Sequence, residues 1–218
     1  MDTRGERAIA DQIAYYRARA NEYDEEFQGA HDPMLVAALA TARPRGRVLE
    51  LACGTGAWTG SLVTHPVTSI LAVDAAPEML AAHAQRIHDA RVERLAADLF
   101  RWKPPEQDDL VTFAFWLSHV PPARFEAFWR MVRGAVADSG RVFFVDQDQR
   151  GLAFEQPSAD ADYPIVPREL QDGRVMSAIK VYHQPAELQV ALEMMGWEAQ
   201  IEPVPGGFFW GEARPASR

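Results

Sequence analysis

Two glycines and an acid, separated by one predicted helix and strand, are the residues of this chain best suited to bind a ligand. Gly54 and Gly56 lie in the segment 50–58, ELACGTGAW, and Asp74 ends the next apolar run, 18 residues after Gly56. Glycines allow a sharp turn from a strand into a helix and a close approach of a ligand to the backbone. A carboxylate at the end of the second strand of a parallel sheet binds the ribose hydroxyls of a nucleoside. The pattern therefore predicts a ligand that contains adenosine.

The same loop discriminates between two kinds of adenosine ligand. The dinucleotide fingerprint G-x-G-x-x-G requires its third glycine at position 59, which is Thr59 here. Glu50 at the start of the loop would repel a pyrophosphate, whereas it suits the ammonium group of a methionine moiety. A nicotinamide-dependent oxidoreductase, the alternative reading, would also need a Tyr-x-x-x-Lys relay, and neither lysine of the chain has a tyrosine four residues before it.

The segment 48–56, VLELACGTG, resembles the first motif of the class I S-adenosylmethionine-dependent methyltransferases, and the resemblance extends from about residue 47 to residue 213. It implies a Rossmann-like, doubly wound α/β fold: a mostly parallel seven-stranded sheet with helices on both faces, a C-terminal antiparallel strand pair and an inserted hairpin. It also implies that S-adenosyl-L-methionine is the methyl donor and S-adenosyl-L-homocysteine the product. The residues expected to bind the donor are Tyr16, Tyr23, Glu50, Ala52, Gly54, Gly56, Asp74, Ala75, Met79, Asp98, Leu99 and Phe115.

For three residues in this region a purely structural role is the alternative to a role in binding or catalysis. The resemblance implies that Met79 lies on the adenine ring, although Met79 could equally belong to a helix core. It implies that Asp98 meets the adenine amino group, although Asp98 could instead cap a turn. Cys53 is expected to be a small buried residue rather than a nucleophile, because no histidine or basic residue stands near it in sequence.

The acceptor side is expected at residues 115–119, FWLSH, which leave the fourth predicted strand at the ligand-binding edge of the sheet. His119 is the candidate catalytic base, because the ordinary pKa of histidine lies near neutrality. His119 could instead only cap or pack the loop, and His183 is a weaker candidate. The segment lacks the Asn/Asp-Pro-Pro-Tyr/Phe motif of enzymes that methylate exocyclic amines of nucleobases or glutamine.

The tyrosine-rich N-terminal segment is expected to cover the site. Tyr16 and Tyr23 are seven residues apart and share one helix face, while Tyr15 and Arg19 are four apart and share another. In relatives with a similar start this helix covers the cofactor, and Arg19 is placed to meet a carboxylate. The alternative is an amphipathic helix that only packs on the body. The residues expected to bind the acceptor are Tyr15, Arg19, Trp116 and Tyr163.

Alternating strands and helices predict a mostly parallel sheet that is covered on both faces. The expected strands are 47–51, 69–73, 92–96, 110–115 and 141–145, and the expected helices are 4–28, 33–42, 77–88, 122–136 and 185–195. Asp172-Gly173 predicts a hairpin of 166–171 and 174–182. Pro205-Gly206 joins an expected antiparallel pair, 197–203 and 207–213.

The length of 218 residues suits a single domain, with 1–44 as an N-terminal helical cap and 147–183 as an inserted loop and hairpin over the acceptor site. Hydrophobic residues make up 48 % of the chain, no run approaches the ~18 residues of a membrane span, and the start lacks a signal peptide, so a cytoplasmic protein is expected. The single cysteine fits that compartment.

The formal charge of -9 counts against a nucleic-acid substrate. We therefore expect an enzyme that methylates an oxygen, or as second choice a nitrogen, of a small-molecule acceptor. It should use no metal, bind no membrane, and be a monomer or homodimer. A non-catalytic module that binds S-adenosylmethionine is the second alternative.

Overall fold

A seven-stranded sheet organises the chain in the computed structural model, which describes residues 3–26 and 32–216. Its strand order is β3-β2-β1-β4-β5-β9-β8, and neighbours are parallel except that β9 runs antiparallel to both β5 and β8. The mostly parallel sheet and the C-terminal antiparallel pair predicted from the sequence are confirmed. The strands are β1 Gly46–Leu51, β2 Val67–Asp74, β3 Val92–Ala96, β4 Asp108–Ala114, β5 Val136–Gln147, β8 Trp197–Val204 and β9 Phe208–Pro215.

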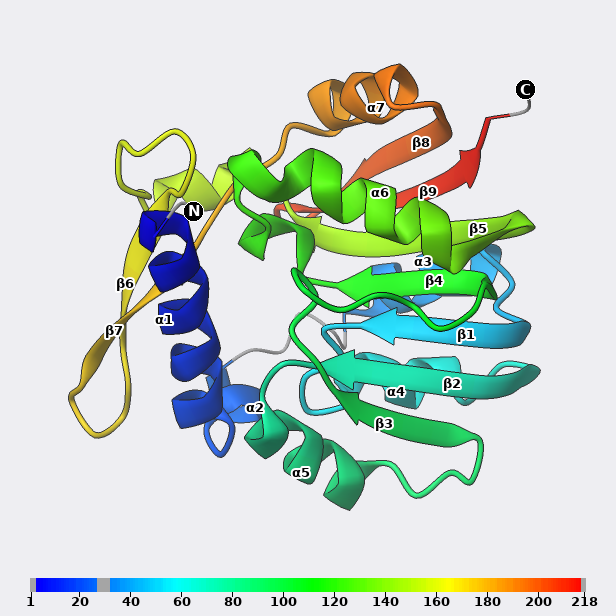
Figure 1. Cartoon of the computed structure of the whole chain (residues 1–218), viewed down its shortest axis with the longest axis horizontal. Coiled ribbons are helices and arrows are strands. Elements are labelled where there is room, and N and C mark those ends of the chain that lie inside the picture. Colours follow the sequence, from blue (N-terminus) through cyan, green and yellow to red (C-terminus); the bar gives the residue numbers. More distant parts are fainter. Residues whose placement is uncertain (1–2, 27–31, 217–218) are drawn as a thin grey trace.

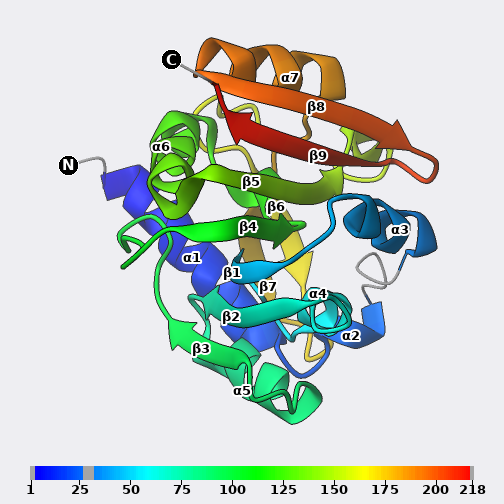
Figure 2. The ribbon, with the colours of Figure 1, turned by 90° about the vertical axis from the view of Figure 1, so that its right-hand side faces the viewer.

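Helices cover both faces of this sheet (Figure 2). Successive residues of a strand point to opposite faces, so Val48 packs with one layer of helices and Leu49 with the other. The first layer consists of α3 Pro33–Thr41, α4 Ala57–Leu62 and α5 Pro77–Arg86, and the second of α6 Phe125–Ala135 and α7 Pro185–Met194. The doubly wound architecture is therefore present.

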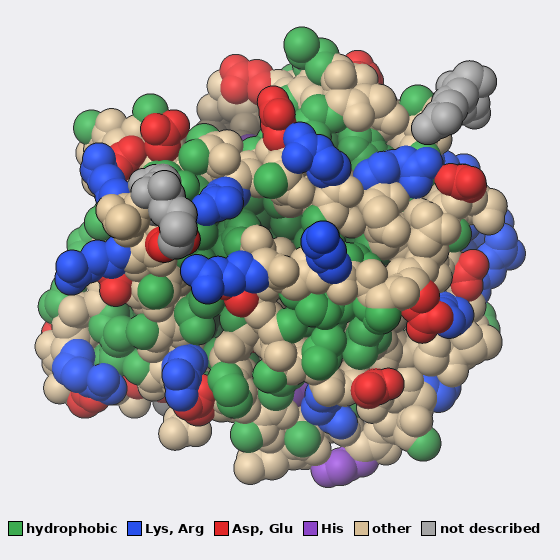
Figure 3. Space-filling model, in the orientation of Figure 1, with side chains coloured by type: hydrophobic (Ala, Val, Ile, Leu, Met, Phe, Trp, Pro, Cys, Tyr) green, Lys and Arg blue, Asp and Glu red, His purple; other side chains and the backbone are tan. Residues whose placement is uncertain are grey.

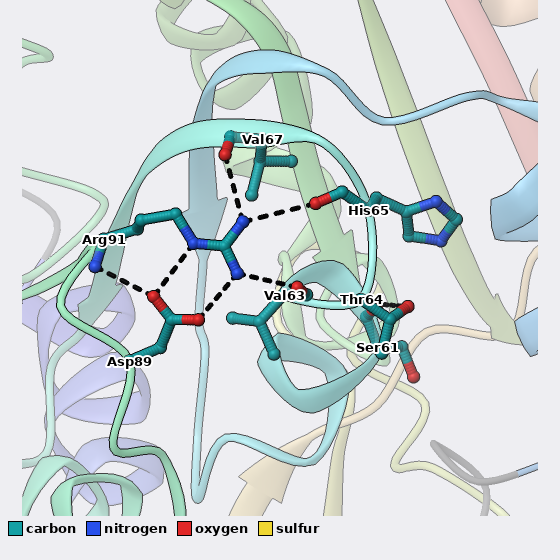
Figure 4. A network of polar contacts seen from close by, with 7 residues as sticks. All are labelled: Ser61, Val63, Thr64, His65, Val67, Asp89 and Arg91. Atoms are coloured by element: carbon teal, nitrogen blue, oxygen red, sulfur yellow. Dashed lines mark hydrogen bonds and ion pairs between the residues drawn. The ribbon is translucent and has the colours of Figure 1, made fainter.

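Arg91 fixes the connection between α4 and β2 (Figure 4). Its guanidinium donates hydrogen bonds to the carbonyl oxygens of Val63 at 2.7 Å, His65 at 3.3 Å and Val67 at 3.1 Å, and it pairs with the Asp89 carboxylate at 2.6 Å. Carbonyl groups at a helix end lack partners within the helix, and here a cation supplies one. Arg91 thus anchors the start of the strand whose far end carries Asp74.

The N-terminal helix and a separate hairpin lie across the carboxyl ends of β1, β2 and β4 (Figure 1). These elements are α1 Thr3–Arg19 and the strands β6 Ile165–Glu169 and β7 Val175–Ile179. The predicted Asp172-Gly173 turn joins β6 to β7, with Gly173 at a φ of 83°. The ligand-binding edge of the sheet is therefore covered by two segments that are more than 100 residues apart in sequence.

The buried side chain of Gln12 joins these two covering segments. Its amide nitrogen donates to the His119 carbonyl at 3.2 Å, and its amide oxygen accepts from the Ile179 backbone N–H at 3.0 Å. Both backbone groups are buried, so each would lose its partner without this glutamine. One polar side chain thus ties α1 both to the hairpin and to the loop after β4.

The N-terminal helix is shorter than predicted. The expected helix 4–28 ends at Arg19, and after a turn the separate α2 spans Tyr23–Glu26; Gln28 lies outside the described residues. At the break Ala20 packs against Ala76 and Met79, and the Tyr23 ring contacts the Tyr16 ring with centroids 6.1 Å apart. Tertiary packing therefore overrides a helical pattern that would have continued.

Charged side chains of both signs are mixed over the face shown in Figure 3, with hydrophobic surface between them. None of the helices among the described residues is long and apolar enough to cross a membrane.

Candidate functional site

The glycine loop leaves β1 in a conformation that most residues avoid. Ala52, Gly54 and Gly56 have φ values of 52°, 53° and 87°. A Cβ on Gly56 would stand 3.0 Å from the His83 ring, so both the φ angle and the close contact require glycine there. Cys53 is buried, and burial raises the pKa of its thiol well above the ordinary range. This agrees with the expectation that Cys53 is not a nucleophile.

Asp74 is held against this loop by backbone hydrogen bonds. One carboxylate oxygen accepts from the Gly54 N–H at 3.0 Å and the other from the Ala76 N–H at 2.8 Å. Burial raises its pKa, and these N–H groups oppose the rise. The second predicted acid, Asp98, accepts from the Phe100 N–H at 2.9 Å and so does cap the turn after β3, but it also lines the cavity described next.

A cavity runs along the glycine loop, between this loop, the N-terminal helix and the loops that follow β2, β3 and β4. Ten of the twelve residues predicted to bind the donor line it: Tyr16, Tyr23, Ala52, Gly54, Asp74, Ala75, Met79, Asp98, Leu99 and Phe115. Carboxylates and loop backbone supply polar partners, while Met79, Leu99 and Phe100 supply apolar walls for a flat base. These features fit a nucleoside with a methionine tail.

The other two predicted residues lie beside this cavity. Glu50 lines a smaller adjoining cavity with Cys53, Thr55 and Trp58. Burial raises the pKa of the Glu50 carboxyl to about 8, opposed by a hydrogen bond from the Thr59 hydroxyl. Gly56 borders neither cavity and acts through the shape of the loop.

Both ring nitrogens of His119 form hydrogen bonds. Its Nδ1–H donates to the Ile179 carbonyl at 2.7 Å, because a carbonyl can only accept, and its Nε2 therefore accepts from the Tyr16 hydroxyl at 2.8 Å. Burial, followed by the charge of Lys180, lowers the pKa of His119 well below 6.5. His119 is thus a neutral imidazole whose basic nitrogen is engaged by Tyr16.

A second cavity adjoins the first and shares Tyr16 with it. Four residues border both cavities: Tyr16, Tyr23, Phe115 and His119. The second cavity is lined by the cations Arg19, Arg168 and Lys180, and by one acid, Glu155, which pairs with Arg168. The exposed Phe154 stands at its edge.

Lys180 is 4 % exposed, and its hydrogen-bond partners are neutral. Its ammonium group donates to the Ser118 hydroxyl at 3.1 Å and to the Gln147 amide oxygen at 2.7 Å. Burial lowers its pKa to about 8, and the nearby Asp146 opposes that fall. Lys180 therefore remains largely protonated at pH 7.

The residues predicted to bind the acceptor are dispersed. Arg19 lines the second cavity, and Trp116 lines the first. Tyr15 is buried against the hairpin with Leu170, and Tyr163 is buried with Ile9 and Ile179, so neither borders these two cavities.

Gln147, Arg168 and Lys180 lie in the segment 147–183 that was expected to cover the acceptor site, but none of them was among the predicted site residues. These residues are far from the glycine loop in sequence, so no local pattern indicated that they line one cavity with Tyr16 and Arg19. His183 is half-buried and packs against Phe125. Asp146 accepts from the Ser118 and Gln147 N–H groups, and no metal-binding cluster of His, Cys, Asp and Glu occurs among residues 3–26 and 32–216.

Comparisons with known proteins agree with this geometry. Residues 48–140 match the model of a methyltransferase domain family. A structure of DhpI with S-adenosylhomocysteine (SAH) is 42 % identical to the chain, covers 97 % of it and 98 % of DhpI, and has a TM-score of 0.85. The DhpI-SAM-HEP complex is also 42 % identical, with coverages of 95 % and 98 % and the same TM-score of 0.85.

A more distant structure shares the fold. The 1,6-didemethyltoxoflavin-N1-methyltransferase of Burkholderia thailandensis is 17 % identical, with coverages of 100 % and 92 % and a TM-score of 0.67. No curated protein sequence matches the chain significantly. On the family match, the DhpI structures and the cavity beside the glycine loop, the chain belongs to the class I S-adenosylmethionine-dependent methyltransferases and is an enzyme that uses S-adenosylmethionine.

Proposed function

We propose that this enzyme transfers the methyl group to an oxygen of a small acidic molecule, which binds in the second cavity. The observation that carries the proposal is the cationic lining of that cavity, with Arg19, Arg168 and Lys180 opposite a single acid. The formal charge of the chain is -9, so this concentration of cations is local. A carboxylate or a phosphoryl acid is the ligand that such a lining attracts.

The two cavities meet where a methyl group would have to pass. S-adenosylmethionine supplies an electrophilic methyl group on a sulfonium. The proposed donor residues line the first cavity, and Glu50 lies beside it. Four residues border both cavities, and they would lie between donor and acceptor: Tyr16, Tyr23, Phe115 and His119. Holding two reactants in line contributes ~7–11 kcal/mol to lowering a barrier. Placement is therefore the main contribution expected from this chain.

The state of His119 favours an acid over a neutral alcohol or an amine. An alcohol would have to pass its proton to the Tyr16 oxygen while Tyr16 passes its own to His119 Nε2, and burial makes that nitrogen a weak base. An acid is already ionised at pH 7 and needs no base. An amine would be an ammonium at this pH and would be repelled by Lys180 and Arg168. We therefore assign Tyr16 to orient the acceptor and His119 to orient Tyr16.

The segments that close the second cavity come from the N-terminal helices and from residues 147–183, which we propose as the cover of the acceptor site. The DhpI-SAM-HEP complex holds HEP together with SAM, and this supports a site for a second small ligand beside the donor in the present enzyme. Its sequence identity of 42 % makes it the appropriate reference for acceptor screening.

The experiment is an acceptor screen with donor labelled in its methyl group. Carboxylic and phosphoryl acids are compared with amides, alcohols and amines of matched shape. A base-labile product identifies a carboxylate methyl ester, and mass spectrometry identifies the base-stable methyl ester of a phosphoryl acid. Acids should be methylated, and Lys180→Met and Arg168→Met should each lower kcat/KM by about 10- to 100-fold, the value of one hydrogen bond to a charged group. Lys103→Met, at an exposed position outside both cavities, is the control. Preference for a matched amine or alcohol would refute the proposal.

A further inference from the structure

A line of four polar side chains runs beneath the glycine loop and ends at Glu50. Arg94 on β3 donates through Nε to His83 Nδ1 on α5 at 2.8 Å. His83 Nε2 lies 2.8 Å from the Thr59 hydroxyl on α4, and that hydroxyl donates to Glu50 Oε2 on β1 at 2.6 Å. His83, Thr59 and Glu50 are each at most 1 % exposed. These hydrogen bonds thus link β3, α5, α4 and β1.

The direction of these hydrogen bonds is fixed by the arginine at the far end. A guanidinium can only donate, so His83 Nδ1 must accept, and the single proton of the neutral ring lies on Nε2. The Thr59 hydroxyl accepts a hydrogen bond from the His83 Nε2–H and donates its own hydrogen bond to Glu50 Oε2. Burial and the charge of Arg94 lower the pKa of His83 to about 4, which keeps the ring neutral. Arg94, His83 and Thr59 therefore each donate a hydrogen bond to the next residue in the direction of the Glu50 carboxyl.

Opposing effects act on the protonation state of the Glu50 carboxyl. Burial and the neighbouring Asp74 favour its protonated form, while the Thr59 hydroxyl favours the carboxylate. The adjoining cavity brings it near Asp24, which pairs with Arg86 on α5, and near the thiol of Cys53. No cation other than the distant Arg94 is joined to Glu50 through the described hydrogen bonds, so a ligand that carries an ammonium group would change the balance.

We propose that Thr59 and His83 are positioning residues for the methyl donor: they orient the Glu50 carboxyl toward the ammonium group of the donor, and Glu50 releases a proton to solvent when that group binds. This inference rests on the proposed placement of the donor along the glycine loop. Thr59 occupies the position at which a dinucleotide fingerprint has glycine, and glycine would leave His83 and Glu50 without the hydroxyl that joins them.

The first test counts protons by calorimetric titration with SAH at pH 7, in buffers of different ionisation enthalpy. With a pKa of about 8 in the free enzyme, Glu50 should release about 0.9 proton at pH 7 and about half a proton at pH 8. The Glu50→Gln variant is subtracted, because the amino group of the ligand contributes equally to both proteins. 5′-Methylthioadenosine, which has the nucleoside without an ammonium group, should bind with no such release. An equal proton count in wild type and Glu50→Gln would overturn the proposal.

The second test separates positioning from folding. Thr59→Val keeps the shape of the side chain and removes the hydroxyl, so SAH should bind about 10- to 100-fold more weakly. Binding of 5′-methylthioadenosine should stay within about 2-fold, and Thr59→Ser should restore SAH binding. At pH 8 the Thr59→Val variant should release nearer one proton than half, because its Glu50 has lost the donor that favours the carboxylate.

The outcomes distinguish this inference from the proposed donor site. If Thr59→Val weakens both ligands equally, Thr59 is only structural and the inference fails. If Thr59→Val binds SAH like the wild type, the inference also fails while the donor site stands. If Glu50→Gln and Asp74→Ala both bind SAH normally, the donor site itself is misplaced.

Discussion

The charge of Lys180 can be tested without knowing the acceptor, through the pH dependence of folding. Burial lowers the pKa of Lys180 from 10.5 to about 8 in the folded protein. Between these two values the unfolded chain binds more protons than the folded chain, so stability rises with pH in this window. Integrating the difference in bound protons from pH 7 to pH 9.5 gives about 2 kcal/mol.

The assay is urea unfolding of wild type and Lys180→Met at pH 7 and at pH 9.5. The wild type should gain about 2 kcal/mol relative to the variant as the pH rises, because methionine has no proton to lose. Lys180→Arg also removes the titration while keeping the charge, and its difference from wild type should change by a similar amount. Lys103→Met controls for loss of a lysine as such.

A change below about 0.5 kcal/mol in both Lys180 variants would refute the reasoning, because it would mean that Lys180 titrates alike in the folded and unfolded chains. The second cavity would then be more hydrated than its lining indicates. A change of about 2 kcal/mol would show that Lys180 loses its charge near pH 8, and binding of the proposed acidic acceptor should then weaken above that pH.

Two further predictions concern the donor loop and the covering helix. Asp74→Ala removes the carboxylate that accepts from Gly54 and Ala76, so calorimetry should show SAH binding weakened by more than about 100-fold, and unchanged binding would contradict the role of Asp74. Gln12→Leu leaves the His119 carbonyl and the Ile179 N–H without their partner, at about 1–3 kcal/mol each. Hydrogen exchange should then quicken in residues 3–19 while β1 and β4 stay protected, and uniform loss of protection would show instead that α1 is an integral part of the core.

Local sequence signals were sufficient to predict the sheet and most of the residues that line the first cavity. The apolar run 47–51, the glycines after it and the acid at 74 are close in sequence, and parallel strands bring their carboxyl ends to one edge. Met79 and Asp98 follow the next two strands by the same rule, so their place around the first cavity was predictable. The single helix expected over 4–28 was wrong at residues 20–22, where a turn separates α1 from α2, because the contacts of Ala20 with Ala76 and Met79 lie outside any local pattern.

The sequence by itself determined the fold class and the donor, since both depend on periodicity and on a motif whose residues are neighbours along the chain. Only the tertiary structure shows the second cavity, which we propose for the acceptor. Arg19 and Lys180 are 161 positions apart, and they line one cavity because Gln12 ties α1 to the hairpin. The same packing brings the Tyr16 hydroxyl into a hydrogen bond with His119 Nε2. Burial lowers the pKa of His119, so the histidine that the sequence suggested as a base is a neutral hydrogen-bond acceptor for Tyr16. Long-range contacts of this kind arise from burial and hydrogen bonding in the folded state, which no spacing along the chain records.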